Sequence, residues 1–113
     1  MQIDIQTRDN ITFITLDGDI DASTAPQVQG QVLPLATPQS SILMDMKKVP
    51  YMSSAGLRML LSTYRQVTAK DGKLVLVGVS EELIETMALT GFLDFIKTTD
   101  TCEEGIDWLR SGS

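Results

Sequence analysis

Two short apolar runs, Ile42–Met46 and Leu74–Val79, constrain the fold more than any other feature of this sequence. Short, largely apolar runs are typical of strands that a sheet buries on both faces. Between them, apolar residues recur with helical spacing as far as about Ala69, which predicts an amphipathic helix. The expected apolar stripe of that helix is Leu57, Leu60, Leu61, Tyr64 and Thr68. Two buried strands joined through a helix pair in parallel with a right-handed crossover, so the sequence predicts an α/β fold.

The N-terminal part of the chain predicts a β-hairpin followed by a helix. Residues 2–7 and 11–17 alternate apolar and polar residues, as half-buried strands do, and three polar residues separate the two segments. A helix is expected from about Pro26 to Leu35, where Ser23 or Thr24 caps its first turn.

The C-terminal part predicts two more helices and a short strand. Ser80 followed by two glutamates indicates a helix start, and Gly91 ends that helix. A last strand is expected at Phe95–Thr98, and Thr101 with Glu104 fits the capping box of a final helix. The predicted order is β-β-α-β-α-β-α-β-α. We expect one α/β domain over residues 1–110, with a mixed sheet of about five strands and four helices, and a disordered tail at 111–113.

The composition excludes several kinds of site. The chain has 113 residues, and 15 Asp and Glu against 9 Lys and Arg give a net charge of −6. Binding to nucleic acid or to an anionic membrane needs a basic face, so neither partner is expected. There is no histidine, and Cys102 is the only cysteine, so neither an intrachain disulfide nor a cysteine-rich zinc site can form. We expect no metal, no cofactor and no catalytic residue, and a structural role for Cys102.

The apolar segments also bear on localisation. The first ten residues contain no basic stretch followed by an apolar run, so no signal peptide is expected. The longest apolar run is far shorter than the roughly 20 residues of a membrane helix. We therefore expect a protein of the reducing cytoplasm that does not insert into a membrane.

The segment from Val49 to Leu57 is the most informative about function. A buried strand ends before it, a proline-containing loop follows, and Ser53 and Ser54 lie at a helix start. In open α/β sheets, ligand and partner sites lie beyond the carboxyl ends of strands. A phosphate on a serine at a helix N-terminus is stabilised by unpaired N–H groups and by the helix dipole. The alternative is that one serine only caps the helix, which contributes about 1 kcal/mol.

The same segment carries a family resemblance. Residues 51–57, Tyr-Met-Ser-Ser-Ala-Gly-Leu, resemble the signature of STAS domains and, more narrowly, that of the bacterial anti-sigma-factor antagonists. The usual form is an aromatic or aliphatic residue, Met or Ile, then Asp-Ser-Ser/Thr-Gly-Leu. Other similar segments follow the family's order: Gly18–Asp21 with Ser23–Ala25, Gly72–Leu74 and Thr90–Leu93. The resemblance covers the whole chain and implies the STAS fold.

The resemblance also implies roles for individual residues. The family's phosphorylated serine lies two residues before the signature glycine, which is Ser54 here. Ser53 stands where the family has Asp and offers a second candidate hydroxyl, whereas Ala55 replaces the second Ser or Thr and cannot accept a phosphate. Asp21 matches the family's acid near this loop, although a carboxylate that caps the first helix is an equal interpretation. The implied partner-binding residues are Asp21, Ser23, Met52, Ser53, Ala55, Gly56 and Leu57.

The function implied by the resemblance is a binding switch controlled by phosphorylation. In the family, the unphosphorylated form binds an anti-sigma factor that is also an ATP-dependent serine kinase, which frees the sigma factor. Phosphorylation of Ser54 by that kinase ends binding. A metal-dependent PP2C-type serine phosphatase restores it.

Two other classes of function stay open at this point. The first is a STAS subunit of a transporter or scaffold assembly without a switch, which the replacement of Asp by Ser53 allows. The second is an enzyme or a receiver-type switch phosphorylated on Asp45. The spacing from Asp45 to Pro50 and Met52 is one residue too long for a receiver, and no general base is evident near Ser54.

Overall fold

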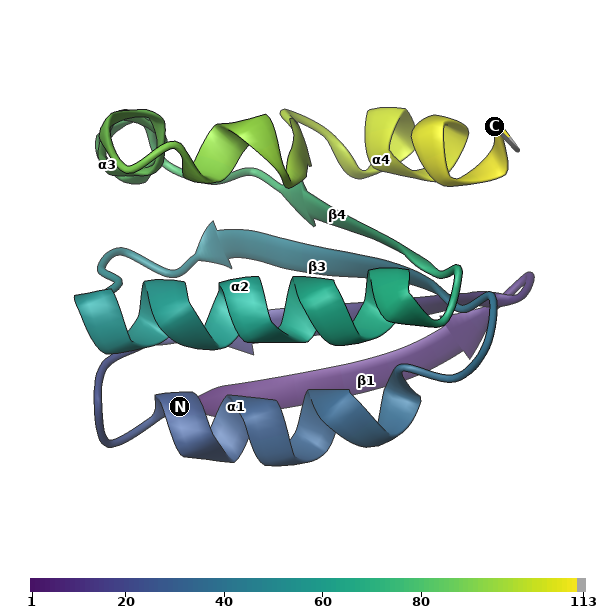
Figure 1. Cartoon of the computed structure of the whole chain (residues 1–113), viewed down its shortest axis with the longest axis horizontal. Helices are drawn as coiled ribbons and strands as arrows, with labels where there is room; N and C mark the ends of the chain where they lie inside the picture. The colour runs from purple at the N-terminus through teal and green to yellow at the C-terminus, as the bar shows by residue number, and fades with distance from the viewer. Residues whose placement is uncertain (112–113) are drawn as a thin grey trace.

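The strands of the sheet lie side by side in chain order in the computed structural model, which describes residues 1–111 (Figure 1). The first pair is an antiparallel hairpin, and all later neighbours pair in parallel. The predicted mixed sheet, opened by a hairpin, is confirmed. The strands are β1 (Gln2–Arg8), β2 (Ile11–Asp17), β3 (Ser41–Lys48), β4 (Lys73–Val77) and β5 (Lys97–Thr99).

Four α-helices cover the sheet within the described residues: α1 (Ala25–Val32), α2 (Ser54–Ala69), α3 (Glu81–Leu89) and α4 (Cys102–Arg110). Two 3₁₀ turns, η1 (Leu33–Leu35) and η2 (Phe92–Asp94), follow α1 and α3. The first helix ends at Val32 instead of the predicted Leu35. Pro34 has no N–H for the next α-helical hydrogen bond, so the chain tightens into η1 there.

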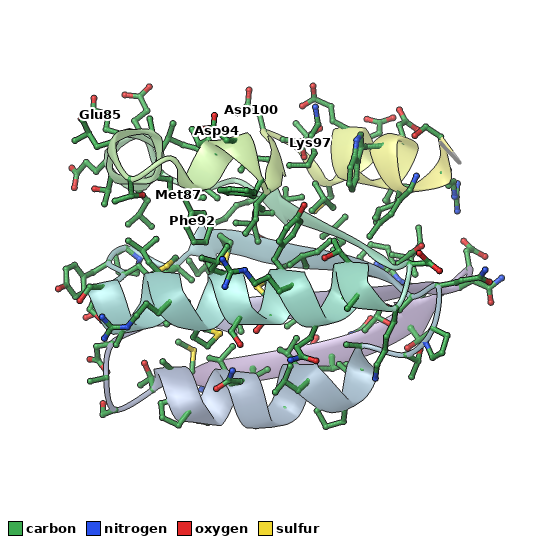
Figure 2. All side chains as sticks on the ribbon, in the orientation of Figure 1. Glu85, Met87, Phe92, Asp94, Lys97 and Asp100 are labelled. Atoms are coloured by element: carbon green, nitrogen blue, oxygen red, sulfur yellow. The ribbon has the colours of Figure 1, made fainter. Side chains whose placement is uncertain are left out.

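Different helices bury the two faces of the sheet. Along β3, Met44 belongs to the main core beneath α1, α2 and α3, whereas its neighbour Leu43 belongs to a smaller cluster beneath α4. Figure 2 shows Met87 and Phe92 directed toward the interior, and Glu85 directed away from it. The central strands are therefore apolar on both faces, as their largely apolar runs predict.

The apolar stripe of α2 is displaced by one residue from the predicted one. The buried positions are Gly56, Met59, Leu60, Thr63 and Val67. Of the predicted stripe only Leu60 is fully buried; Leu57, Leu61 and Tyr64 are half-buried, and Thr68 is exposed. One residue corresponds to about 100° of helix rotation. The rotation turns Gly56 toward the loop before α2 and leaves Leu57 and Leu61 on the flank beside η2.

The last strand begins later than predicted, at Lys97 instead of Phe95. Gly91 has a left-handed backbone (φ 76°) and starts η2, which buries Phe92. Ile96 is buried as well, so Phe95 between them points outward and is 59% exposed. Phe95 caps the 3₁₀ turn, so Phe95 and Ile96 belong to the turn region and the strand starts only at Lys97.

Two further predictions concern the C-terminal tail and membrane insertion. Residues 112 and 113 of the predicted tail lie outside the described residues, whereas the hydroxyl of Ser111 donates to the Trp108 carbonyl at 2.7 Å and closes α4. Among residues 1–111, none of the helices has the length and hydrophobicity that a bilayer crossing requires.

Candidate functional site

The predicted site lies at the edge of the sheet where β3 ends and α2 begins (Figure 1). Backbone hydrogen bonds tie this loop to the segment that follows β2. The N–H of Gly18 donates to the Lys48 carbonyl at 3.0 Å. The N–H of Ile20 donates to the Tyr51 carbonyl at 3.0 Å, and the N–H of Ser53 donates to the Ile20 carbonyl at 2.9 Å. These bonds extend the pairing of β2 with β3 and bring two predicted site segments together.

The two serines at the start of α2 have different roles. Ser53 is the N-cap, with extended backbone, and its half-buried side chain accepts a hydrogen bond from the N–H of Gly56 at 3.3 Å. Ser54 is the first residue of the helix and is exposed, and within residues 1–111 its hydroxyl makes no hydrogen bond. The cap that the sequence allowed at either serine is therefore Ser53. Ser54 is left with a free hydroxyl at the helix N-terminus.

Gly56 allows the start of α2 to approach the neighbouring loops closely. A Cβ at this position would lie 2.6 Å from Met52 Cγ and 2.8 Å from the Ile20 carbonyl oxygen. Met52 itself is only 4% exposed and belongs to the main core. Met52 and Gly56 are both buried in the free chain, and their contact with a partner stays a prediction. Both residues lie beneath the loop, where Gly56 packs closely against Met52 and Ile20.

Asp21 organises the turn that leads into α1. One carboxylate oxygen accepts from the N–H of Ser23 at 2.9 Å, from the Ser23 hydroxyl at 2.7 Å and from the N–H of Thr24 at 3.1 Å. The Ser23 hydroxyl, followed by these backbone N–H groups, holds the pKa of the Asp21 carboxyl below its usual value. Thr24 is the N-cap residue of α1, without a side-chain cap of its own.

Two shallow grooves run along the flanks of α2 and meet at its first turns. The α1–α2 groove is lined by Ala22, Ala25, Pro26, Gln29, Ala55, Arg58, Met59 and Ser62. The α2–η2 groove is lined by Ser54, Leu57, Arg58, Leu61, Thr90 and Phe92. Of the predicted partner residues, Ala55 and Leu57 thus lie on opposite flanks of the helix. Arg58 lines both grooves but was not predicted from the sequence, where its only signal is its spacing of one helical turn from Ser54.

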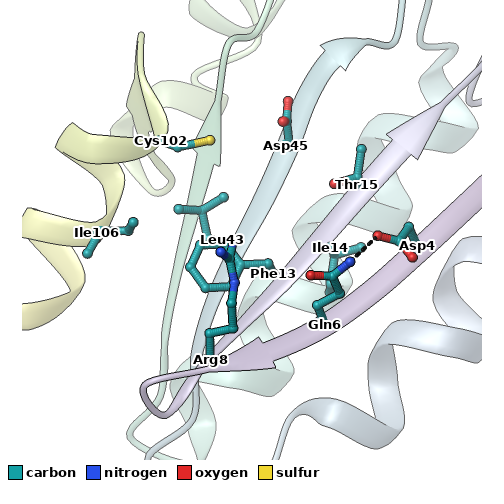
Figure 3. Close-up of a pocket in the computed structure, with 10 residues that line it drawn as sticks. All are labelled: Asp4, Gln6, Arg8, Phe13, Ile14, Thr15, Leu43, Asp45, Cys102 and Ile106. Atoms are coloured by element: carbon teal, nitrogen blue, oxygen red, sulfur yellow. Dashed lines mark hydrogen bonds between the residues drawn. The ribbon is translucent and has the colours of Figure 1, made fainter.

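A separate pocket lies on the other face of the sheet, between α4 and the first three strands (Figure 3). Asp45 lines it and pairs with Lys47 at 3.7 Å. Cys102 lines it as well, with Lys47 Nζ 3.8 Å from its Sγ. Because α2 covers the opposite face, Asp45 and Ser54 belong to different surfaces of the domain. The hydroxyl at the start of α2 therefore has no carboxylate of β3 beside it.

Comparisons with known proteins agree with this fold. The family model of the STAS domain matches residues 2–105. The anti-sigma-B factor antagonist of Bacillus subtilis (strain 168) is 30% identical over 106 residues, which are 94% of this chain and 97% of that protein. An anti-sigma factor antagonist from Mycobacterium paratuberculosis has a TM-score of 0.86 at 20% identity, covering 97% of this chain and 94% of that one.

A further solved structure shares the fold. It is the Bacillus cell fate determinant SpoIIAA in its phosphorylated form, with a TM-score of 0.72 at 20% identity over 96% of this chain and 100% of that one. The mixed sheet that opens with a hairpin is that of a small α/β domain of one known class. The chain belongs to the STAS domain family, in the group of the bacterial anti-sigma factor antagonists.

Proposed function

We propose that this chain is a phosphorylation-controlled binding protein of the anti-anti-sigma type, with Ser54 as its phosphate acceptor. The observation that carries the proposal is the difference between the two serines at the start of α2. Ser53 uses its hydroxyl to cap the helix, whereas Ser54 is exposed and its hydroxyl is unbonded within residues 1–111. This difference supports Ser54 over Ser53 as the hydroxyl that a kinase reaches.

The name of a relative supports an anti-sigma factor as partner, whereas the kinase and the phosphatase are implied by the family resemblance. The Bacillus subtilis relative is an anti-sigma-B factor antagonist, and we extend that role to this chain. Its unphosphorylated form then binds an anti-sigma factor that is also a serine kinase, and thereby frees a sigma factor. A PP2C-type serine phosphatase removes the phosphate and restores binding. In this scheme the chain is a regulator without a catalytic group of its own.

A phosphate on Ser54 acts by charge and leaves the fold intact. It adds about −1.5 to −2 charge at pH 7. The N-terminus of α2 has no acidic residue in its first turn, so the helix dipole stabilises the phosphate in the free protein. At an interface the dianion must be desolvated, which costs several kcal/mol unless cations meet it, and roughly 3 kcal/mol corresponds to a hundredfold in affinity. Phosphorylation therefore ends binding.

Affinity purification from the native host tests this proposal with two forms of the chain. Ser54→Ala cannot be phosphorylated at that position, whereas the second form carries phosphoserine at 54, introduced during translation. We expect Ser54→Ala to retain an anti-sigma factor with kinase activity and the phosphoserine form to lose it. Equal recovery of transporter or scaffold subunits by both forms would instead indicate a STAS subunit that does not switch.

A further inference from the structure

Arg58 is the one charged residue among the described side chains that line the two grooves beside α2. It is exposed, and within residues 1–111 it forms no ion pair. The two helices beside the α1–α2 groove offer no internal acid, because α1 and α2 contain neither Asp nor Glu. From residue 22 to residue 70 the only acid in the sequence is Asp45, which lines the pocket on the other face of the sheet. The elements α3 and η2 carry acids, but within residues 1–111 none of them lies within ion-pair distance of the Arg58 guanidinium.

The spacing between Ser54 and Arg58 brings the two side chains together. Residues four apart on a helix are neighbours on one face, with about 5 to 6 Å between their Cβ atoms. Both residues line the α2–η2 groove, together with Leu57 and Phe92. A guanidinium can bind a phosphate through two parallel N–H bonds, which an ammonium cannot do. A phosphate on Ser54 therefore lies within reach of this side chain.

We propose that Arg58 is the internal partner of the phosphate on Ser54. The inference rests on the proposed function, because it concerns the phosphorylated form of the same serine. In the unmodified chain Arg58 is available at the surface between the two grooves. In the phosphorylated chain its guanidinium pairs with the phosphate, so phosphorylation both adds negative charge and withdraws the single cation of this surface. Arg58 is thus a positioning residue for the phosphate.

The backbone of the first turn competes for the same phosphate. The N–H of Gly56 donates to the Ser53 hydroxyl, and the N–H of Leu57 donates to the Ser53 carbonyl. The N–H groups of Ser54 and Ala55 remain at the helix start. They also favour the dianion, but they are the same in every side-chain variant of Arg58. A substitution at Arg58 therefore isolates the guanidinium.

Phosphorus NMR of the full chain with phosphoserine introduced at 54 during translation tests the pairing. The second ionisation of the phosphate is followed by pH titration in the parent protein, in Arg58→Gln and in Arg65→Gln. Arg65 is the matched control, because it is an exposed arginine of the same helix, seven residues further from the phosphate. Arg58→Lys separates the charge from the two-bond geometry.

We expect the titration midpoint to rise by about 0.3 pH unit in Arg58→Gln, because an i,i+4 ion pair on a helix favours the dianion by that amount. Arg65→Gln leaves the midpoint unchanged, and Arg58→Lys gives an intermediate value. No rise in Arg58→Gln, or an equal rise in both Gln variants, overturns the proposal. The phosphoserine is introduced during translation, so the result of the titration does not depend on whether a kinase modifies Ser54 in the native host.

Discussion

The N-terminus of α2 and the N-terminus of α4 begin with the same kind of cap but treat charge differently. In α4 the Thr101 hydroxyl accepts from the N–H of Glu104 at 3.1 Å, and the Glu104 carboxylate accepts from the N–H of Thr101 at 3.2 Å. Glu103 and Glu104 place two acids in that first turn. In α2 the Ser53 cap stands alone and the first turn has no acid. In α4, acidic side chains of the chain itself thus interact with the positive end of the helix dipole, whereas no acidic side chain of the first turn does so in α2.

The third helix supports the same contrast. It starts with a Ser80 cap and carries Glu81 and Glu82 in its first turn, like α4. The first turn of α1 is also free of acids, but there the Asp21 carboxylate accepts from the N–H groups of Ser23 and Thr24 just before the helix. Among the described helices, α2 therefore differs from the others in having no carboxylate at its start. Such a helix start suits a site that holds an anion only when the serine is phosphorylated.

The largest effect is expected from Gly56→Ala, which removes the close approach that positions the start of α2. The added Cβ would meet the Ile20 carbonyl oxygen at 2.8 Å, so backbone has to move. We expect a loss of about 1 to 3 kcal/mol in the free energy of unfolding, measured with urea. Gly30→Ala is the control, because it lies in α1 with nothing within 4 Å of the new Cβ. Equal effects of the two substitutions would contradict the role given to Gly56.

Removal of the caps compares the two helix starts directly. Ser53→Ala should lower the free energy of unfolding by about 1 kcal/mol, because the N–H of Gly56 loses its acceptor. Thr101→Ala should cost at least as much, since the reciprocal bond with Glu104 is lost as well. Ser54→Ala should change stability by less than about 0.5 kcal/mol. A larger loss in Ser54→Ala than in Ser53→Ala would show that the roles of the two serines are reversed.

The sequence predicted the elements of this site better than their detailed roles. The spacing of the signature placed Ser53 and Ser54 at the helix start, but which one caps depends on where the first helical residue falls. The contact of Gly56 with Ile20 fixes that point and rotates the buried stripe of α2 by one residue. The start of the helix and the rotation of its buried stripe both depend on tertiary contacts, since the contacting segments are far apart in the chain.

The grooves beside α2 also depend on tertiary contacts that the local sequence pattern does not predict. Phe92 reaches the side of Leu57 only because η2 follows α3 across the sheet, which no local pattern states. The same turn displaced the predicted strand at Phe95. Met52 looked available as a loop residue, yet it is buried because the loop pairs with the segment after β2.

Ala55→Glu gives α2 the acidic first turn that α3 and α4 already have. It should stabilise the unmodified protein by about 0.3 to 1 kcal/mol at low salt, since a carboxylate then meets the helix dipole. The gain should shrink at high salt, where the charge is screened. Ala55→Gln is the neutral control of similar size. A loss of stability in the glutamate variant alone would show that the start of α2 is not open to an anion.

The smallest effect is expected from the ionisation of Asp21. Its folded pKa is depressed, so its charge stabilises the fold above the unfolded pKa, about 3.9, and this contribution is lost as the pH falls through the folded pKa. Asp21→Asn keeps an oxygen acceptor and removes only the charge. Urea unfolding should give Asp21→Asn a lower free energy of unfolding than the parent protein at pH 7, and this difference should shrink below pH 4. Asp19→Asn, at an exposed neighbour, is the control variant.

Phosphopeptide mass spectrometry of the protein from its native host shows directly which serine at the start of α2 carries a phosphate. Trypsin cleaves after Lys48 and Arg58, so a single peptide, residues 49–58, contains both serines. We expect phosphate on Ser54, absent from Ser54→Ala and present in Ser53→Ala. Phosphate on Ser53 in the parent protein, or an unmodified peptide under every growth condition, would contradict the proposed switch at Ser54.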